Sequence, residues 1–160
     1  MAETSIDAKT FWRALGARAT GVVVATARGA DGPAGFLALS ATHLTAEPPT
    51  MLVTIDKRTS ALAAVVHAKH FALNFLPRGD QALAAMFSGR TEIHGAARFA
   101  PDRWGALTTG APVLNEAVGA IDCVLEETID RFAVTIAIGR MVDWVARDGE
   151  PLIFFRGAYR

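Results

Sequence analysis

The sequence has a single cysteine, Cys123, among its 160 residues. A disulfide within the chain is therefore impossible, and this sparing use of cysteine is typical of proteins in a reducing compartment, so we expect a cytoplasmic protein. Cys123 is in phase with Ile121 and Leu125 in a segment that alternates with Asp122. This pattern predicts a buried core thiol rather than a reactive nucleophile.

Long apolar runs are also missing. The longest stretch without a charged side chain is residues 32–46, and it contains Pro33, Ser40 and His43. A membrane-spanning helix needs about 20 predominantly apolar residues, so this stretch is too short and too polar. Residues 1–5 lack the positive start and apolar run of a signal peptide. We therefore expect no membrane association.

Net charge is absent as well, because 16 basic residues balance 16 acidic ones. This balance argues against a general basic surface for nucleic acid. A hydrophobic fraction of 51% excludes a disordered chain, and 160 residues suit one domain over residues 1–160. The mean hydropathy of +0.27 is high for a small protein without a membrane span. We attribute the excess to a surface buried against a second copy, and expect a homodimer.

Motifs for several kinds of chemistry do not occur. The four histidines, His43, His67, His70 and His94, have no accompanying cysteine pair or His-Glu-x-x-His spacing, so we expect no metal site. The chain has no Gly-x-Ser-x-Gly for a hydrolase, no Gly-x-Gly-x-x-Gly for a Rossmann site and no P-loop. A nucleotide cofactor, if used, must be held in another way.

What the sequence does contain is a series of β-strand patterns. Runs rich in β-branched and alternating apolar residues predict strands over residues 21–26, 35–41, 51–55, 71–76, 118–128, 132–145 and 151–155. Helical spacing predicts a first helix that starts near Ser5 or Asp7, and two more over residues 60–68 and 81–87. Residues 88–116 have no regular pattern apart from a turn around Trp104. Strands joined by hairpins with short inserted helices favour a mainly β fold with a closed antiparallel barrel.

One pair of segments suggests a ligand site. The strand over residues 35–41 changes from apolar to small and hydroxylated side chains, which lets a flat ring approach the backbone. The turn at residues 56–60 combines two cations, two hydroxyls and a helix start, which is the chemistry of a phosphate site. An ordinary solvated turn, with Thr59 or Ser60 as the helix N-cap, explains the same residues.

A wider set of motifs resembles a known family. The segment Gly35-x-x-x-x-Ser40-x-Thr42-x-Leu44-Thr45-x-Glu47-Pro48-Pro49 is joined by matching segments in the same order at residues 20–23, 71–76, 87–90, 109–114 and 151–159. Together they resemble the flavin reductase-like family of FMN-binding split barrels, which supply reduced flavin to two-component monooxygenases. The resemblance covers nearly the whole chain.

The resemblance implies an antiparallel Greek-key split β-barrel that binds FMN, or alternatively FAD, near the interface of a homodimer. It implies hydride transfer from NADH or NADPH to the flavin N5, and a partner oxygenase that uses the reduced flavin. It assigns no catalytic side chain to this sequence. The cofactor-binding residues that it implies are Leu37, Ala38, Leu39, Ser40 and Ala41 beside the flavin ring, Asp56, Lys57, Arg58, Thr59 and Ser60 near the ribityl phosphate, and Asn74 close to the site.

The sequence departs from the family pattern at three positions. Leu37 and Leu39 stand where the family commonly has Thr and Ser, so two hydroxyls are missing beside the flavin. Val134 stands where reductases of the family often have a histidine that helps to receive the nicotinamide. Three functions remain open: an NAD(P)H-dependent flavin reductase, a non-catalytic FMN-binding or delivery protein, and a flavoprotein that reduces another acceptor, such as a cobalt corrinoid.

Overall fold

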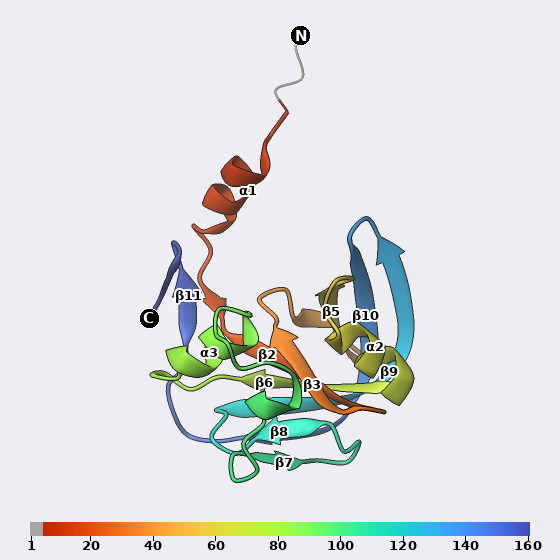
Figure 1. Cartoon of the computed structure of the whole chain (residues 1–160). Coiled ribbons are helices and arrows are strands. Elements are labelled where there is room, and N and C mark those ends of the chain that lie inside the picture. The colour runs from red at the N-terminus through yellow and green to blue at the C-terminus, as the bar shows by residue number, and fades with distance from the viewer. Residues whose placement is uncertain (1–4) are drawn as a thin grey trace.

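The computed structural model describes residues 5–160 and shows a mainly β protein built around one antiparallel sheet (Figure 1). The sheet has seven strands in the order β3-β2-β6-β9-β10-β5-β4, and every described pairing in it is antiparallel. The strands are β2 (Val23–Gly29), β3 (Gly32–Leu37), β4 (Thr42–Ala46), β5 (Pro49–Asp56), β6 (His70–Phe75), β9 (Gly119–Arg131) and β10 (Val134–Ala146). The predicted mainly β, antiparallel fold is confirmed.

Two small sheets and three helices complete the structure. The small sheets are β1 (Thr20–Gly21), β11 (Ile153–Phe155) and β12 (Ala158–Tyr159), and the pair β7 (Trp104–Ala106) and β8 (Pro112–Leu114). The helices are α1 (Ala8–Leu15), α2 (Ala61–Ala68) and α3 (Gln81–Phe87), with a 3-10 turn η1 (Gly95–Arg98). None of these helices within residues 5–160 has the length and apolar character needed to cross a membrane.

The predicted strand over residues 35–41 is wrong at its C-terminal end. Strand β3 ends at Leu37, because the chain then leaves the β2–β3 hairpin and turns at Leu39 and Ser40. The backbone N–H of Ala38 still donates to the carbonyl of Val23, at 2.7 Å. Beyond the turn the chain forms β4, an edge strand that the sequence pattern does not predict, because all five of its residues are exposed.

The long C-terminal hairpin also differs from the prediction. Strand β9 continues through residues 129–131, which separate the two strands predicted over 118–128 and 132–145, and the chain reverses at Phe132, which has a φ of 51° and is 87% exposed. In β10, Thr135 and Ala137 face the core, while the apolar side chains on the other face are half-buried: Val134, Ile136 and Ile138. Residues 88–116, predicted to be irregular, contain β7 and β8.

The centre of the core is tightly packed around Phe71, which is fully buried. A Cβ added at Gly139 would lie 2.6 Å from the Phe71 ring and 3.0 Å from the Cβ of Cys123, so this strand position requires glycine. Cys123 itself is fully buried, and burial raises the pKa of its thiol to about 12. The predicted core thiol is confirmed, since such a group stays protonated and unreactive.

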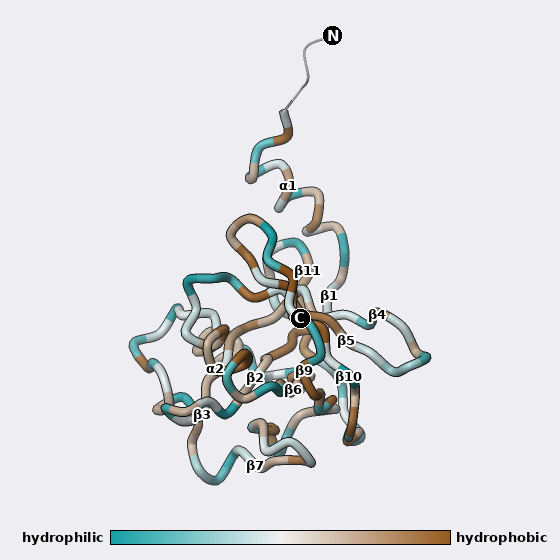
Figure 2. The backbone as a smooth tube through the Cα atoms, turned by 90° about the vertical axis from the view of Figure 1, so that its right-hand side faces the viewer, coloured by the Kyte–Doolittle hydropathy of each residue, from teal (hydrophilic) through white to brown (hydrophobic). Residues whose placement is uncertain are grey.

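Helix α1 stands away from the sheet (Figure 1). Asp7 begins it as predicted, because its carboxylate accepts from the backbone N–H of Thr10 at 2.8 Å. None of its residues is buried, and Phe11 and Trp12 are 51% and 66% exposed. The tube in Figure 2 shows hydrophobic positions along this exposed helix. An eight-residue helix is marginal in water, so α1 requires a partner for its apolar side chains.

Asn74 is a fully buried side chain that joins β2, β6 and β8. Its amide nitrogen donates to the carbonyls of Val24, at 3.1 Å, and Pro112, at 3.3 Å. Its amide oxygen accepts from the backbone N–H of Leu114 at 2.8 Å. A side chain that saturates three backbone groups in the core fixes the position of the β7–β8 segment.

We expect Asn74→Leu to lower the free energy of unfolding by about 3 kcal/mol, because the buried Leu114 N–H loses its acceptor. Urea unfolding followed by circular dichroism measures this loss. Asn115→Ala is the matched control, since the exposed Asn115 amide donates only to the carbonyl of Asp102, and its removal should cost about 0.5 kcal/mol. Equal losses for the two variants would contradict the role assigned to Asn74.

Candidate functional site

A groove lies where the edge strand β3 faces β5, at the opening of the sheet. It consists of two cavities of about 540 and 610 Å³ that share Trp12, Leu37 and Thr54. We call the two cavities together the groove. The residues that line it come from α1 and the segment after it, the end of β3 with the turn after it, β4, β5 with the turn to α2, α3 with the loop after it, η1 and β10. Its volume suits a drug-sized or cofactor-sized molecule.

The β3 side of the groove is apolar. Gly35 permits this wall, because a Cβ there would lie 2.9 Å from the Phe87 ring of α3. Leu37 and Leu39 line the groove, whereas Ala38 is 2% exposed and packs in the core. Ala41 also packs against the core. Of the five residues predicted beside a flat ring, three therefore line the groove, and Ala38 and Ala41 do not.

Ser40 is the third of these residues, and its hydroxyl is anchored to β5. It accepts from the hydroxyl of Thr54 at 2.7 Å and lies 3.3 Å from the Thr54 backbone N–H. Ser40 is exposed and lines the larger cavity with Thr42. This pair of hydroxyls holds the β3–β4 crossing against β5 and places polar atoms at the edge of the apolar wall.

The predicted phosphate turn is only partly directed at the groove. Asp56 and Thr59 line it. The guanidinium of Arg58 binds the Asp56 carboxylate through two bonds of 3.0 and 2.7 Å, and this hydrogen bonding lowers the pKa of Asp56 to about 2. The Arg58 side chain is 89% exposed, and the Nζ of Lys57 lies 3.9 Å from a carboxylate oxygen of Asp130. Arg58, one of the two cations of the turn, is thus paired with Asp56, the carboxylate that lines the groove.

The helix start at this turn involves Thr59 and Ser60 differently. The hydroxyl of Thr59 accepts from the backbone N–H of Ala61 at 3.4 Å, whereas Ser60, at the N-cap position, makes no side-chain capping bond. Ser60 lines a different, neighbouring cavity. Asn74 lies outside the groove, because its side chain is saturated within the core.

Several groove residues were not predicted as ligand contacts. Trp12, Thr54, Ser88, Gly89 and Arg98 line it, and Val134 lies on its floor from β10. Ser88 and Gly89 belong to a motif that carries the family resemblance, so they had a sequence signal. Arg98 had none, because it stands in a segment without periodicity. The described residues contain no group of three side chains able to bind a metal ion.

The groove is suited to binding rather than to acid–base chemistry. Leu37, Leu39 and Trp12 supply apolar surface for a planar ring, and the hydroxyls of Ser40, Thr59 and Ser88 supply hydrogen bonds along its length. Among residues 5–160 the one carboxylate that lines it, Asp56, is held as an anion by Arg58. Such a site orients a bound molecule that carries its own reactivity.

Comparison with known proteins finds flavin reductases both by sequence and by structure. The profile described as flavin reductase like domain matches residues 15–160. The chain is 35% identical over 159 residues to the FMN reductase (NADH) RutF of Agrobacterium fabrum, a match that covers 99% of this chain and 88% of that protein.

Two solved structures are similar throughout. The NADH:FAD oxidoreductase SgcE6 of Streptomyces globisporus has a TM-score of 0.86 and 25% identity, with 100% of this chain and 98% of that chain covered. BorF, the flavin reductase component of a bacterial two-component tryptophan halogenase, has a TM-score of 0.88 and 25% identity, with 96% and 97% covered.

Proposed function

Because the chain belongs to the flavin reductase-like family, we propose that it binds FMN in the groove and transfers a hydride from NADH to it. The observation that carries this proposal is the groove itself. It brings together Leu37, Ser40 and Thr59, which are predicted flavin contacts from separate segments. The identity of the donor is supported by the name FMN reductase (NADH) of the relative from Agrobacterium fabrum.

The residues of the groove fit a flavin in size and chemistry. The apolar side chains of Leu37 and Leu39 would pack against the ring, and the Ser40 hydroxyl would bond its polar edge. Thr59, which lines the groove, and Lys57, from the same β5–α2 turn, would hold the ribityl phosphate. When bound, the flavin would supply the redox chemistry, as the acceptor of the hydride that converts NADH to NAD⁺.

The proposal extends to the assembly and its setting. We propose that the chain forms a homodimer. Two observations support this: α1 has no buried residue, and β10 has a half-buried apolar face formed by Val134, Ile136 and Ile138. A partner oxygenase or halogenase that consumes the reduced flavin is supported by the likeness to BorF. A cytoplasmic location agrees with the single buried cysteine.

The purified wild-type protein should oxidise NADH faster than NADPH, and only when FMN is added or already bound. Absorbance at the nicotinamide band follows the reaction, and flavin fluorescence titration measures binding separately. FMN binding without oxidation of either nucleotide would favour a non-catalytic flavin carrier. A protein that binds no flavin would overturn the proposed function.

The dimer is tested by the mass of the protein in solution. Sedimentation equilibrium should give a species of twice the 17.0 kDa chain mass. Burial of α1 against a second copy removes Phe11 and Trp12 from water, which is the physical reason for association. A monomer across the micromolar range would contradict the proposal.

Lys57→Ala should weaken FMN about tenfold and riboflavin hardly at all, because only FMN carries the phosphate that the ammonium binds. Fluorescence titration with the two flavins measures the difference. Lys69→Ala is the matched control, since Lys69 is an exposed lysine at the other end of α2. Equal losses for FMN and riboflavin would show that Lys57 does not bind the phosphate.

Val134 leaves the groove floor without a polar anchor for the nicotinamide, so hydride transfer from NADH should be slow. We expect Val134→His to raise kcat/KM for NADH about tenfold. Val134→Leu, which stays apolar, should give no gain. Fast turnover by the wild type, with no improvement in the histidine variant, would contradict this prediction.

A further inference from the structure

A pair of hydroxyls lies where the two cavities of the groove meet. Thr54, from β5, lines both cavities, and Ser40, from the β3–β4 crossing, lines the larger one beside it. The hydroxyl oxygens of the two residues are 2.7 Å apart. Most of the side chains that share the larger cavity with them are apolar, among them Trp12, Leu37 and Leu39. The pair is therefore a polar point in an apolar wall.

The hydrogen bonds within the pair determine where each hydroxyl proton points. The Ser40 oxygen accepts from the Thr54 hydroxyl at 2.7 Å and from the Thr54 backbone N–H at 3.3 Å, and the Ser40 hydroxyl donates to the Thr54 carbonyl at 3.4 Å. This arrangement makes three hydrogen bonds. If Ser40 donated to the Thr54 hydroxyl instead, the bond to the carbonyl would be lost and two would remain. The first arrangement is therefore favoured.

The pair consequently presents two groups of opposite polarity. A hydroxyl has one proton and two lone pairs. The proton of Thr54 is used on Ser40, so the Thr54 oxygen offers lone pairs to the groove. The lone pairs of Ser40 are used by Thr54, but its proton is held only by the long bond of 3.4 Å, so a better-placed acceptor can take it. Thr54 is thus an acceptor and Ser40 a donor, side by side.

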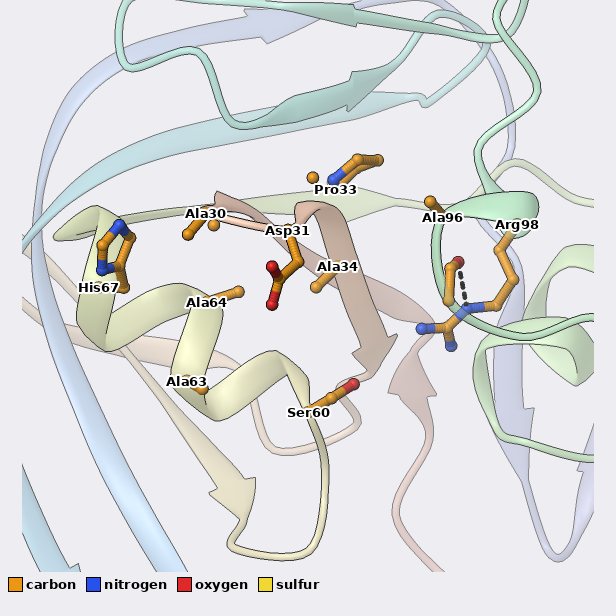
Figure 3. A pocket seen from close by; sticks show the side chains of 13 residues that line it. Ala30, Asp31, Pro33, Ala34, Ser60, Ala63, Ala64, His67, Ala96 and Arg98 are labelled. Carbon is orange, nitrogen blue, oxygen red and sulfur yellow. Dashed lines mark hydrogen bonds between the residues drawn. The ribbon is translucent and has the colours of Figure 1, made fainter.

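Other hydroxyls near the groove are not oriented in this way. Ser88 donates to the carbonyl of Ala85 at 2.8 Å, at the end of its own helix. Ser60 lines the adjoining cavity between the β2–β3 turn, α2 and η1 (Figure 3), and it makes no capping bond that would direct its proton. In the part of the chain that the structure describes, Ser40 and Thr54 are the hydroxyls at the groove that direct each other's protons.

A donor beside an acceptor is complementary to an amide edge, in which a carbonyl oxygen lies next to an N–H. We propose that Ser40 and Thr54 select such an edge in a bound molecule: the Ser40 hydroxyl donates to its carbonyl, and the Thr54 oxygen accepts from its N–H. A molecule without the N–H places no donor against Thr54 and loses one bond. Ser40 also positions Thr54, because it holds the Thr54 proton away from the ligand.

This inference rests on the proposed function, which brings two molecules with an amide edge to the groove. The flavin has one in its pyrimidine ring, and NADH has one in its carboxamide. The chemistry that the pair selects is the same in both, and the experiments below distinguish the two sources.

Thr54→Val tests the acceptor, since valine has the shape of threonine without its hydroxyl. The wild type should prefer FMN to 3-methyl-FMN, which has a methyl group in place of the ring N–H, and the variant should lose about fivefold of this preference in fluorescence titration. Thr54→Ser, which keeps a hydroxyl, should retain the wild-type preference. Thr128→Val is the matched control, since Thr128 is an exposed threonine of β9 outside the groove.

Ser40→Ala tests the direction of the Thr54 proton. Without Ser40 this proton is free to turn toward a ligand, so the preference for FMN over 3-methyl-FMN should again fall about fivefold. If Ser40 only holds the chain crossing in place, the variant should weaken both flavins by the same factor. The preference is a ratio measured on one protein, so a loss of folded material in a variant does not change it.

The nicotinamide is tested with the reduced acetylpyridine analogue of NADH, which keeps the carbonyl and has a methyl group in place of the amide nitrogen. If the carboxamide is the edge that the pair selects, Thr54→Val should raise KM for NADH about fivefold and leave KM for the analogue unchanged. The preference between the two flavins should then stay at its wild-type value in both variants.

The failure of this inference differs from the failure of the proposed function. A wild type that binds FMN, with neither preference altered by Thr54→Val or Ser40→Ala, would overturn the inference and retain the function. Equal losses for both members of each ligand pair would do the same, because they indicate packing alone. A wild type that binds neither flavin nor NADH would overturn the proposed function, and this inference with it.

Discussion

The chain crossing between β3 and β4 is the constraint on which the site depends. The sheet ends in these two strands, and the chain must travel from one edge to the other through residues 38–41. Two contacts hold it: the Ala38 N–H to the carbonyl of Val23, and the Ser40 hydroxyl to Thr54. Because the crossing is tied to β2 on one side and β5 on the other, Leu39 and Ser40 are held in place at the side of the groove. The groove exists because the sheet does not close there.

The electrostatics of the site follow from one ion pair. Arg58 occupies the Asp56 carboxylate, so the anion that lines the groove is neutralised before any ligand arrives. Without that pair, Asp56 would oppose a phosphate at the same turn. Arg98 lies across the groove without a carboxylate partner among residues 5–160, and it keeps its charge available. Both cations of the β5–α2 turn lie beside carboxylates, whereas Arg98 in η1 lines the groove and has no ion pair among the described residues.

Local patterns in the sequence predict the elements well where burial is regular. Strands β2 and β6 and helix α3 follow their apolar periodicity, and Asp7 caps α1 as expected. The pattern fails where tertiary contacts decide. The end of β3 at Leu37 depends on hydrogen bonds to distant strands, and β4 is exposed on every residue. Asn74 shows the same limit, because a motif cannot distinguish a ligand contact from a buried amide that bonds Leu114. Arg98 has no sequence pattern that predicts it as a site residue, and only the folded chain brings it to the groove.

The exposed apolar side chains of α1 account for part of the high hydrophobic fraction of the sequence, and they also contribute to the groove. Trp12 is 66% exposed, yet it lines both cavities of the groove from a helix that buries none of its residues. A wall made by such a helix is not rigid in a single chain, since eight residues do not hold a helix in water. A rigid groove therefore needs α1 to be packed from outside. A second copy that covers α1 would fix the position of Trp12 and thereby complete the site. Dimer formation and ligand binding would then be thermodynamically coupled, each favouring the other.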